Sequence, residues 1–123
     1  MPMLGYALPI LPGKLEHWRR FCQELLGIYQ EEYRASRERL GITREYAWLQ
    51  ATPEGEMVIY YLEGVSPGQL FGVLANSSQP FDRWLLEQLA ELHGFEPGCP
   101  DFEATHNELV FEWQTATGSQ LKA

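Results

Sequence analysis

Few side chains in this sequence could carry acid–base chemistry, and they stand far apart along the chain. His17 lies in a segment with helical spacing, and because imidazole changes charge near neutral pH it could act as a base at the rim of a cavity. Glu63 ends a strand-like run rich in aromatic residues, where a buried carboxyl group could act as a general acid. We take His17 and Glu63 as the candidate catalytic residues. The alternatives are a solvent-facing helix histidine and an exposed acid at a strand end.

The remaining histidines and both cysteines fit structural roles better. His93 precedes Gly94 at the end of a helical pattern, where the helix dipole stabilises a protonated imidazole. His106 lies in an irregular segment, and no two histidines have the spacing of metal ligands. Cys22 and Cys99 are too far apart for a zinc or redox motif, and the sequence has no hydrolase elbow, P-loop or dinucleotide fingerprint. We therefore expect no metal site and no cofactor.

A break between two helical patterns offers a different kind of site. Residues 76–79 interrupt the apolar spacing, and Pro80 begins the next helix with Asp82 in its first turn. Free backbone N–H groups at a helix N-terminus can hold an anion or a carboxylate, so Asp82 is a candidate ligand contact. The alternative is that Asp82 only complements the helix dipole.

The strongest structural signal is a pair of strand-like runs, residues 44–52 and 56–63, around a short turn that contains Gly55. A two-residue turn at Glu54–Gly55 would place Trp48 opposite Tyr61. Because side chains alternate across a strand, one face then carries Tyr46, Trp48, Gln50, Ile59, Tyr61 and Glu63. The other face carries Ala47, Leu49, Ala51, Val58, Tyr60 and Leu62. The second set suits a surface under helices, and the aromatic first set suits an interface or a ligand cavity. A three-residue turn would instead swap half of these assignments.

Aromatic residues elsewhere in the chain add to the evidence for a ligand cavity. We predict a ligand pocket between the sheet and the helices, with His17 or Glu63 as its polar group. The predicted ligand-binding aromatic residues are Tyr6, Trp48, Tyr61, Trp84 and Trp113. The alternative for each of them is ordinary packing, since aromatic side chains dominate cores as well as sites.

The elements that must position these residues follow from periodicity. Strands are predicted at 3–11, where Pro9 favours an edge position, and at 108–114. A long helix is predicted over 14–40, with Gly27 marking a bend or a close approach. A second helix is broken into 67–75, which starts at a Ser66 cap, and 80–93. Residues 95–107 form a loop, and 116–123 form a mobile tail.

Composition sets the broad class. The chain has 123 residues, which suits one domain over 1–115, and a formal net charge of -8, which disfavours nucleic acid as a partner. No apolar run approaches the ~20 residues of a membrane helix, and the start of the chain lacks the pattern of a signal peptide. We therefore expect a cytoplasmic protein with no membrane partner.

The order strand, helix, strand, strand, helix, strand predicts an α+β, ferredoxin-like βαββαβ fold. Its antiparallel four-stranded sheet would have two helices, the second of them broken, on one face. The opposite aromatic face would be unusually large for a monomer, so we predict a homodimer in which two sheets cover each other.

The sequence resembles the dimeric α/β-barrel superfamily, which includes antibiotic-biosynthesis-type monooxygenases. The resemblance rests on this order of elements, the Pro12-Gly13-Lys14 entry into the first helix, and the stretches WLQATPEGEMVIYYLEG and SSQPFDRWLLEQLAELHG, which are similar to those of small bacterial proteins of this type. It covers about residues 3–114 and implies a homodimer that oxidises an aromatic or polyketide substrate without a metal. We therefore expect a small-molecule-binding domain, and a cofactor-independent monooxygenase-like enzyme as its extension. The alternative is a non-catalytic protein whose aromatic sheet face serves only to dimerise.

Overall fold

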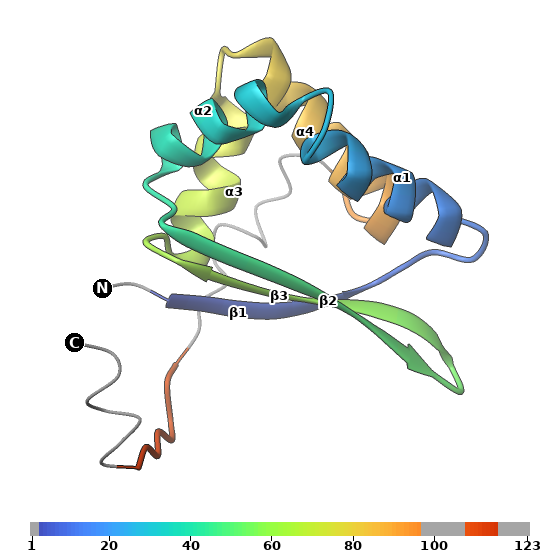
Figure 1. The fold of residues 1–123 in the computed structure, drawn as a ribbon, viewed down its shortest axis with the longest axis vertical. Helices are drawn as coiled ribbons and strands as arrows, with labels where there is room; N and C mark the ends of the chain where they lie inside the picture. Colours follow the sequence, from blue (N-terminus) through green and yellow to red (C-terminus); the bar gives the residue numbers. More distant parts are fainter. Residues whose placement is uncertain (1–2, 97–107, 116–123) are drawn as a thin grey trace.

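The computed structural model describes residues 3–96 and 108–115 of the chain. Within them a three-stranded antiparallel sheet is covered on one face by four helices (Figure 1). The strands are β1 (Met3–Pro9), β2 (Arg44–Thr52) and β3 (Gly55–Glu63), in the order β1-β3-β2. The helices are α1 (Leu15–Leu25), α2 (Gln30–Leu40), α3 (Pro67–Asn76) and α4 (Pro80–His93). The predicted α+β class is confirmed.

The β2–β3 hairpin has the predicted faces but a different register. Trp48 pairs with Ile59 and Thr52 with Gly55, so the turn residues are Pro53 and Glu54 rather than Glu54 and Gly55. The shift from the predicted pairing is two residues, which is one full period of side-chain alternation. Every side chain therefore stays on the face that the sequence predicts.

The long helix predicted over 14–40 is two helices. The chain leaves helical geometry at Leu26 and resumes it at Gln30, and the turn between them contains Gly27. Leu26 and Ile28 in this turn are 77% and 73% exposed, so the apolar stripe of α1 does not continue through it. Gly27 marks the break, as its poor helix propensity indicates.

The second predicted helix is broken where expected, between Asn76 and Pro80. α3 begins with a capping box, in which Ser66 Oγ accepts from the Gln69 N–H at 3.3 Å and Gln69 Oε1 accepts from the Ser66 N–H at 3.0 Å. α4 has Pro80 in its first turn and ends at Gly94 with a φ of 80°. These caps set the ends of the two helices, as the sequence predicts.

A close approach joins the end of α2 to the end of β3. Gly41 and Gly64 both have positive φ, and a Cβ built on Gly64 would lie 2.1 Å from the Gly41 carbonyl oxygen. The Thr43 N–H donates to the Glu63 carbonyl at 2.9 Å beside this contact. Only glycine at position 64 lets the chain turn from α2 into β2 against the sheet.

The predicted last strand at 108–114 is not formed. Residues 108–115 have no strand assignment, their side chains are exposed, and the segment lies away from the sheet (Figure 1). Leu109, Phe111 and Trp113 alternate as in a strand but have no apolar surface against them in this arrangement. The sheet of the described residues is therefore three-stranded. Residues 97–107, with Cys99 and His106, and the tail 116–123 lie outside the described residues.

The core fills the space between the sheet and the helices. Leu4, Val58 and Leu62 from the sheet are 0–1% exposed and belong to one hydrophobic cluster with buried residues of all four helices. Among the described residues, no helix is both long and apolar enough to cross a membrane.

Candidate functional site

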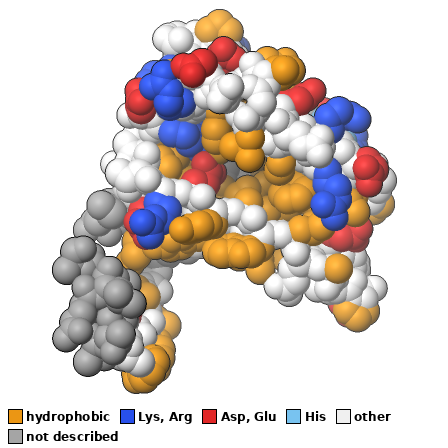
Figure 2. Space-filling model, viewed as in Figure 1, with side chains coloured by type: hydrophobic (Ala, Val, Ile, Leu, Met, Phe, Trp, Pro, Cys, Tyr) orange, Lys and Arg blue, Asp and Glu red, His pale blue; other side chains and the backbone are white. Residues whose placement is uncertain are grey.

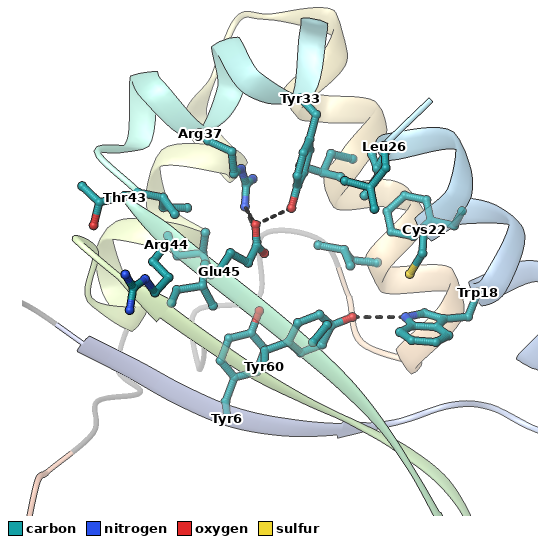
Figure 3. Close-up of a pocket in the computed structure, with 18 residues that line it drawn as sticks. Tyr6, Trp18, Cys22, Leu26, Tyr33, Arg37, Thr43, Arg44, Glu45 and Tyr60 are labelled. Atoms are coloured by element: carbon teal, nitrogen blue, oxygen red, sulfur yellow. Dashed lines mark hydrogen bonds and ion pairs between the residues drawn. The ribbon is translucent and has the colours of Figure 1, made fainter. Parts of the chain in front are cut away.

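A cavity of about 550 Å³ lies between the inner face of the sheet and the helices. Figure 2 shows hydrophobic side chains gathered in a hollow where the helices face the sheet, and Figure 3 shows the residues that line it. The volume falls within the ~300–1,000 Å³ of typical ligand sites. Its wall is formed by Tyr6, Trp18, Phe21, Cys22, Leu25, Leu26, Tyr33, Arg37, Ile42, Thr43, Arg44, Glu45, Ala47, Tyr60, Leu62, Leu70, Leu85 and Leu89.

One part of the cavity wall is polar and is built by α2 and the first residues of β2. The Tyr33 hydroxyl donates to Glu45 Oε1 at 2.5 Å, and Arg37 Nη1 donates to Glu45 Oε1 and Oε2 at 3.2 and 3.4 Å. The Arg37 guanidinium also lies over the Tyr33 ring, 4.4 Å from its centroid. Burial raises the pKa of Tyr33, which therefore remains a neutral donor to Glu45.

A chain of hydrogen bonds runs from the cavity into the core. Trp18 Nε1 donates to the Tyr60 hydroxyl oxygen at 3.4 Å, and this oxygen lies 2.8 Å from His93 Nε2. His93 Nδ1 lies 2.7 Å from the Pro9 carbonyl oxygen. A carbonyl only accepts, so Nδ1 carries a hydrogen. His93 is 4% exposed, and burial lowers its pKa, so the imidazole is neutral and Nε2 accepts the Tyr60 proton in a hydrogen bond.

Aromatic and thiol groups complete the surface around Tyr60. Tyr6 stacks on Tyr60 with ring centroids 4.9 Å apart, and burial raises the pKa of both phenols. Cys22 on α1 contributes a thiol whose pKa burial raises to about 11. Because thiolate is the reactive form, Cys22 is a weak nucleophile here and acts as part of the apolar wall.

Of the residues predicted to bind ligand, Tyr6 alone lines this cavity. Trp48 and Tyr61 lie on the opposite face of the sheet, where Trp48 is 52% exposed and stacks on Tyr46 with centroids 5.6 Å apart. Glu63 shares that face and accepts from the Tyr61 hydroxyl at 2.5 Å. The alternation that the sequence predicts for β3 puts these side chains on the side without helices, so they cannot line a pocket under the helices.

The other predicted site residues also lie outside the cavity wall. His17 on α1 contacts Gln88 of α4, with 2.9 Å between Nε2 and Oε1. Trp84 packs against Phe21, with ring centroids 5.9 Å apart. Trp113, in the segment 108–115, is 73% exposed.

Asp82 has a full set of partners within the chain. Arg39 Nη2 donates to its Oδ1 at 2.8 Å, and Ser77 Oγ donates to its Oδ2 at 2.7 Å. Burial opposes ionisation of Asp82, but the hydrogen bonds from Arg39 and Ser77 outweigh it and lower the pKa of the carboxyl group. These contacts join α2 to α4 and give Asp82 a structural role.

The polar residues of the cavity were assigned other roles from the sequence. Tyr60 belongs to the predicted apolar sheet face, Trp18 lies within the helix predicted over 14–40, and the position of His93 indicates an interaction with the helix dipole. Arg37 belongs to a run of mixed charges typical of an exposed helix face, but its side chain is only 14% exposed. The sequence signal that points to it is Tyr33 four residues earlier, which places an apolar ring on the same side of α2.

Among the described residues, no group of three or more His, Cys, Asp or Glu side chains could hold a metal ion. Comparison with family models, with curated proteins and with solved structures finds no match to this chain.

Proposed function

We propose that this protein binds a small, largely apolar ligand in the cavity between the sheet and the helices. The observation that supports this proposal is an aromatic-lined space of about 550 Å³ that contains one polar cluster, Tyr33–Arg37–Glu45. Ligand sites commonly combine a large apolar surface with a few polar groups that orient the ligand. A cavity without function would gain stability if it were filled, because unfilled apolar volume costs packing energy.

The polar cluster gives the ligand an orientation. Among the described residues, Arg37 makes its hydrogen bonds only with Glu45 and only through Nη1. Its second terminal nitrogen is therefore available to a carbonyl, hydroxyl or carboxylate oxygen of the ligand. The ligand that fits best is an aromatic or polycyclic molecule with at least one oxygen substituent, for which Arg37 offers one donor in the cavity wall.

The proposal extends to chemistry on this ligand. The resemblance to antibiotic-biosynthesis-type monooxygenases suggests oxidation of an aromatic substrate by molecular oxygen without a metal. The cavity supports this extension through its apolar lining, which would shield a reactive anion from water, and through the Tyr60 phenol in its wall, which is hydrogen-bonded to the His93 imidazole behind it and could exchange a proton with a substrate.

Binding of beta-methoxynaphthalene, a neutral aromatic probe, tests the proposal. Ala47→Phe should fill the cavity, because Ala47 belongs to its wall, and should weaken binding at least tenfold. The matched control is Ala51→Phe, which adds the same ring to the same face of β2 outside the cavity wall and should leave affinity unchanged. Titration of probe fluorescence measures both affinities. No binding by the wild type, or equal affinity in the two variants, would contradict the proposal.

A second candidate function is dimerisation through the outer face of the sheet. Tyr46 and Trp48 are 47% and 52% exposed there, stacked on each other and next to Tyr61. Aromatic residues at this density are typical of interfaces. In a ferredoxin-like fold, which we also propose, residues 108–114 would add to the free edge of β1 and widen this aromatic face with Leu109, Phe111 and Trp113. The two functions are compatible, since they use opposite faces of one sheet.

A further inference from the structure

Tyr60 differs from the other polar groups of the cavity because its proton is directed away from the cavity toward a buried base. We infer that the cavity takes an aromatic or enolic ligand with an acidic hydroxyl group, which donates to Tyr60, and that Tyr60 and His93 together accept the proton of that hydroxyl. This inference rests on the proposed function, because it assigns the ligand class and the proton acceptor of the same cavity.

The direction of the hydrogen bonds fixes the role of Tyr60. The Pro9 carbonyl accepts from His93 Nδ1, so Nε2 has a lone pair and accepts from the Tyr60 hydroxyl. The Tyr60 oxygen then has two lone pairs, and Trp18 Nε1 uses one of them at 3.4 Å. The other lone pair can accept from a ligand. Figure 3 shows the Tyr60 hydroxyl beside Trp18 in the cavity wall.

The apolar surface around Tyr60 favours a ring next to that hydroxyl group. The Tyr6 and Trp18 rings and the Cys22 thiol lie beside Tyr60 in the wall. Aliphatic and carbohydrate hydroxyl groups are too weakly acidic to lose a proton to imidazole. Phenols and enols are far stronger acids than these hydroxyl groups, and their flat conjugated bodies suit aromatic walls.

The proton transfer needs two hydrogen-bonded steps and no other reagent. The O–H bond of the ligand breaks as its proton joins the Tyr60 oxygen. At the same time the original Tyr60 O–H bond breaks, and the proton that Tyr60 carried joins His93 Nε2. The products are a ligand anion, neutral Tyr60 and an imidazolium ion whose Nδ1–H remains on the Pro9 carbonyl. Electrons stay with the ligand oxygen.

The empty and occupied cavities favour different charge states of His93. Burial lowers the pKa of His93, so the empty cavity keeps it as a free base. A ligand anion held at Tyr60 adds a nearby negative charge, which favours the imidazolium. The other groups close to Tyr60 are Cys22, which is neutral, and Glu45, whose negative charge also favours a cation and is shared with Arg37.

A photoacid tests this inference directly. Beta-naphthol becomes strongly acidic on excitation and emits at different wavelengths as naphthol and as naphtholate. Bound to the wild-type protein, it should emit mainly as naphtholate, because the Tyr60–His93 pair accepts its proton within the excited-state lifetime. His93→Gln provides the control for structure, since glutamine can accept from Tyr60 and donate to Pro9 but is not a base. Its complex should emit mainly as naphthol, and Tyr60→Phe should behave in the same way.

Each outcome separates the inference from the proposed function. If the wild type binds beta-methoxynaphthalene as tightly as beta-naphthol, the inferred need for an acidic hydroxyl group is wrong, but the cavity is still a ligand site. Equal naphtholate emission from wild type and His93→Gln would overturn the role of His93. Failure of both probes to bind would overturn the proposed function itself. Circular dichroism of the two variants confirms that they are folded before emission is compared.

Discussion

At the scale of single residues, the buried carboxyl group of Asp82 makes stability depend on pH. Its side chain is 3% exposed and pairs with Arg39, and its pKa is below the ordinary value of 3.8. A carboxyl group with a lowered pKa in the folded state stabilises the fold above its unfolded pKa. This contribution is lost as pH falls below the ordinary value and through the lower folded pKa.

We predict that Asp82→Ala lowers the free energy of unfolding by about 3 kcal/mol at neutral pH, because it leaves Arg39 and Ser77 without their shared acceptor. The difference between wild type and variant should shrink in the acid range described above. Urea denaturation at several pH values measures both effects. Arg34→Gln is the control: Arg34 pairs with Glu31 and Glu38 on an exposed surface, so little change is expected. A difference that does not vary with pH would contradict the argument.

Sequence patterns do not separate exposed from buried charged side chains well, because they give the spacing of residues along an element but not how deeply each side chain is buried. Arg34, Arg37 and Arg39 lie in one charged run, yet Arg34 is on the surface, Arg37 borders the cavity and Arg39 reaches a buried acid. What separates them is the partner that the fold brings near: Glu45 on β2 for Arg37 and Asp82 on α4 for Arg39. His93 was misjudged for the same reason, since Tyr60 and Pro9 are distant in sequence.

At the scale of elements, the contact between Gly41 and Gly64 fixes how α2 meets the sheet. A strained φ alone is expected to lower the free energy of unfolding by about 1–3 kcal/mol. We predict a larger loss for Gly64→Ala, because its Cβ would collide with the Gly41 carbonyl. Gly13→Ala is the matched control: Gly13 has a φ of 82° and nothing within 4 Å of a built Cβ. Thermal unfolding of both variants gives the comparison, and equal losses would show that the collision is relieved cheaply.

The elements themselves were largely predictable. Strand faces, the cap at Ser66 and the break before Pro80 follow from local chemistry, which the sequence states directly. The register of the hairpin was wrong by two residues because Pro53–Glu54 and Glu54–Gly55 are both acceptable turns. The division of the first long helix was only indicated by Gly27, since one glycine does not decide between a bend and a break.

At the scale of the whole molecule, the two faces of the sheet differ: helices cover the inner face, and the outer face carries exposed aromatic residues. If the outer face dimerises, the wild-type chain should sediment as a species of twice 14.2 kDa. Trp48→Glu should raise the dissociation constant of the dimer at least tenfold, because a charge replaces an exposed apolar ring at the interface. Ala51→Glu adds the same charge to the opposite face of β2 and should leave the mass unchanged. A monomeric wild type at high concentration would contradict the dimer.

The location of the cavity was predicted only in part. The sequence indicates an apolar sheet face under helices, but it does not show that helix packing leaves space there. Aromatic residues with polar tips, such as Trp48 and Tyr61, looked more like a site than Tyr60 did. The cavity is instead made by residues of ordinary core type, and it exists only because their packing leaves volume between them.

The turn between α1 and α2 has a consequence for the speed of ligand exchange. Leu26, which is 77% exposed, belongs both to this turn and to the cavity wall. Movement of a short turn takes nanoseconds to microseconds, whereas separating a helix from the sheet requires slower, cooperative opening. A ligand that enters past Leu26 would therefore exchange rapidly while the sheet and the Tyr60–His93 pair stay in place. Residence time in this protein would be set by the contacts of the ligand and not by the opening of the fold.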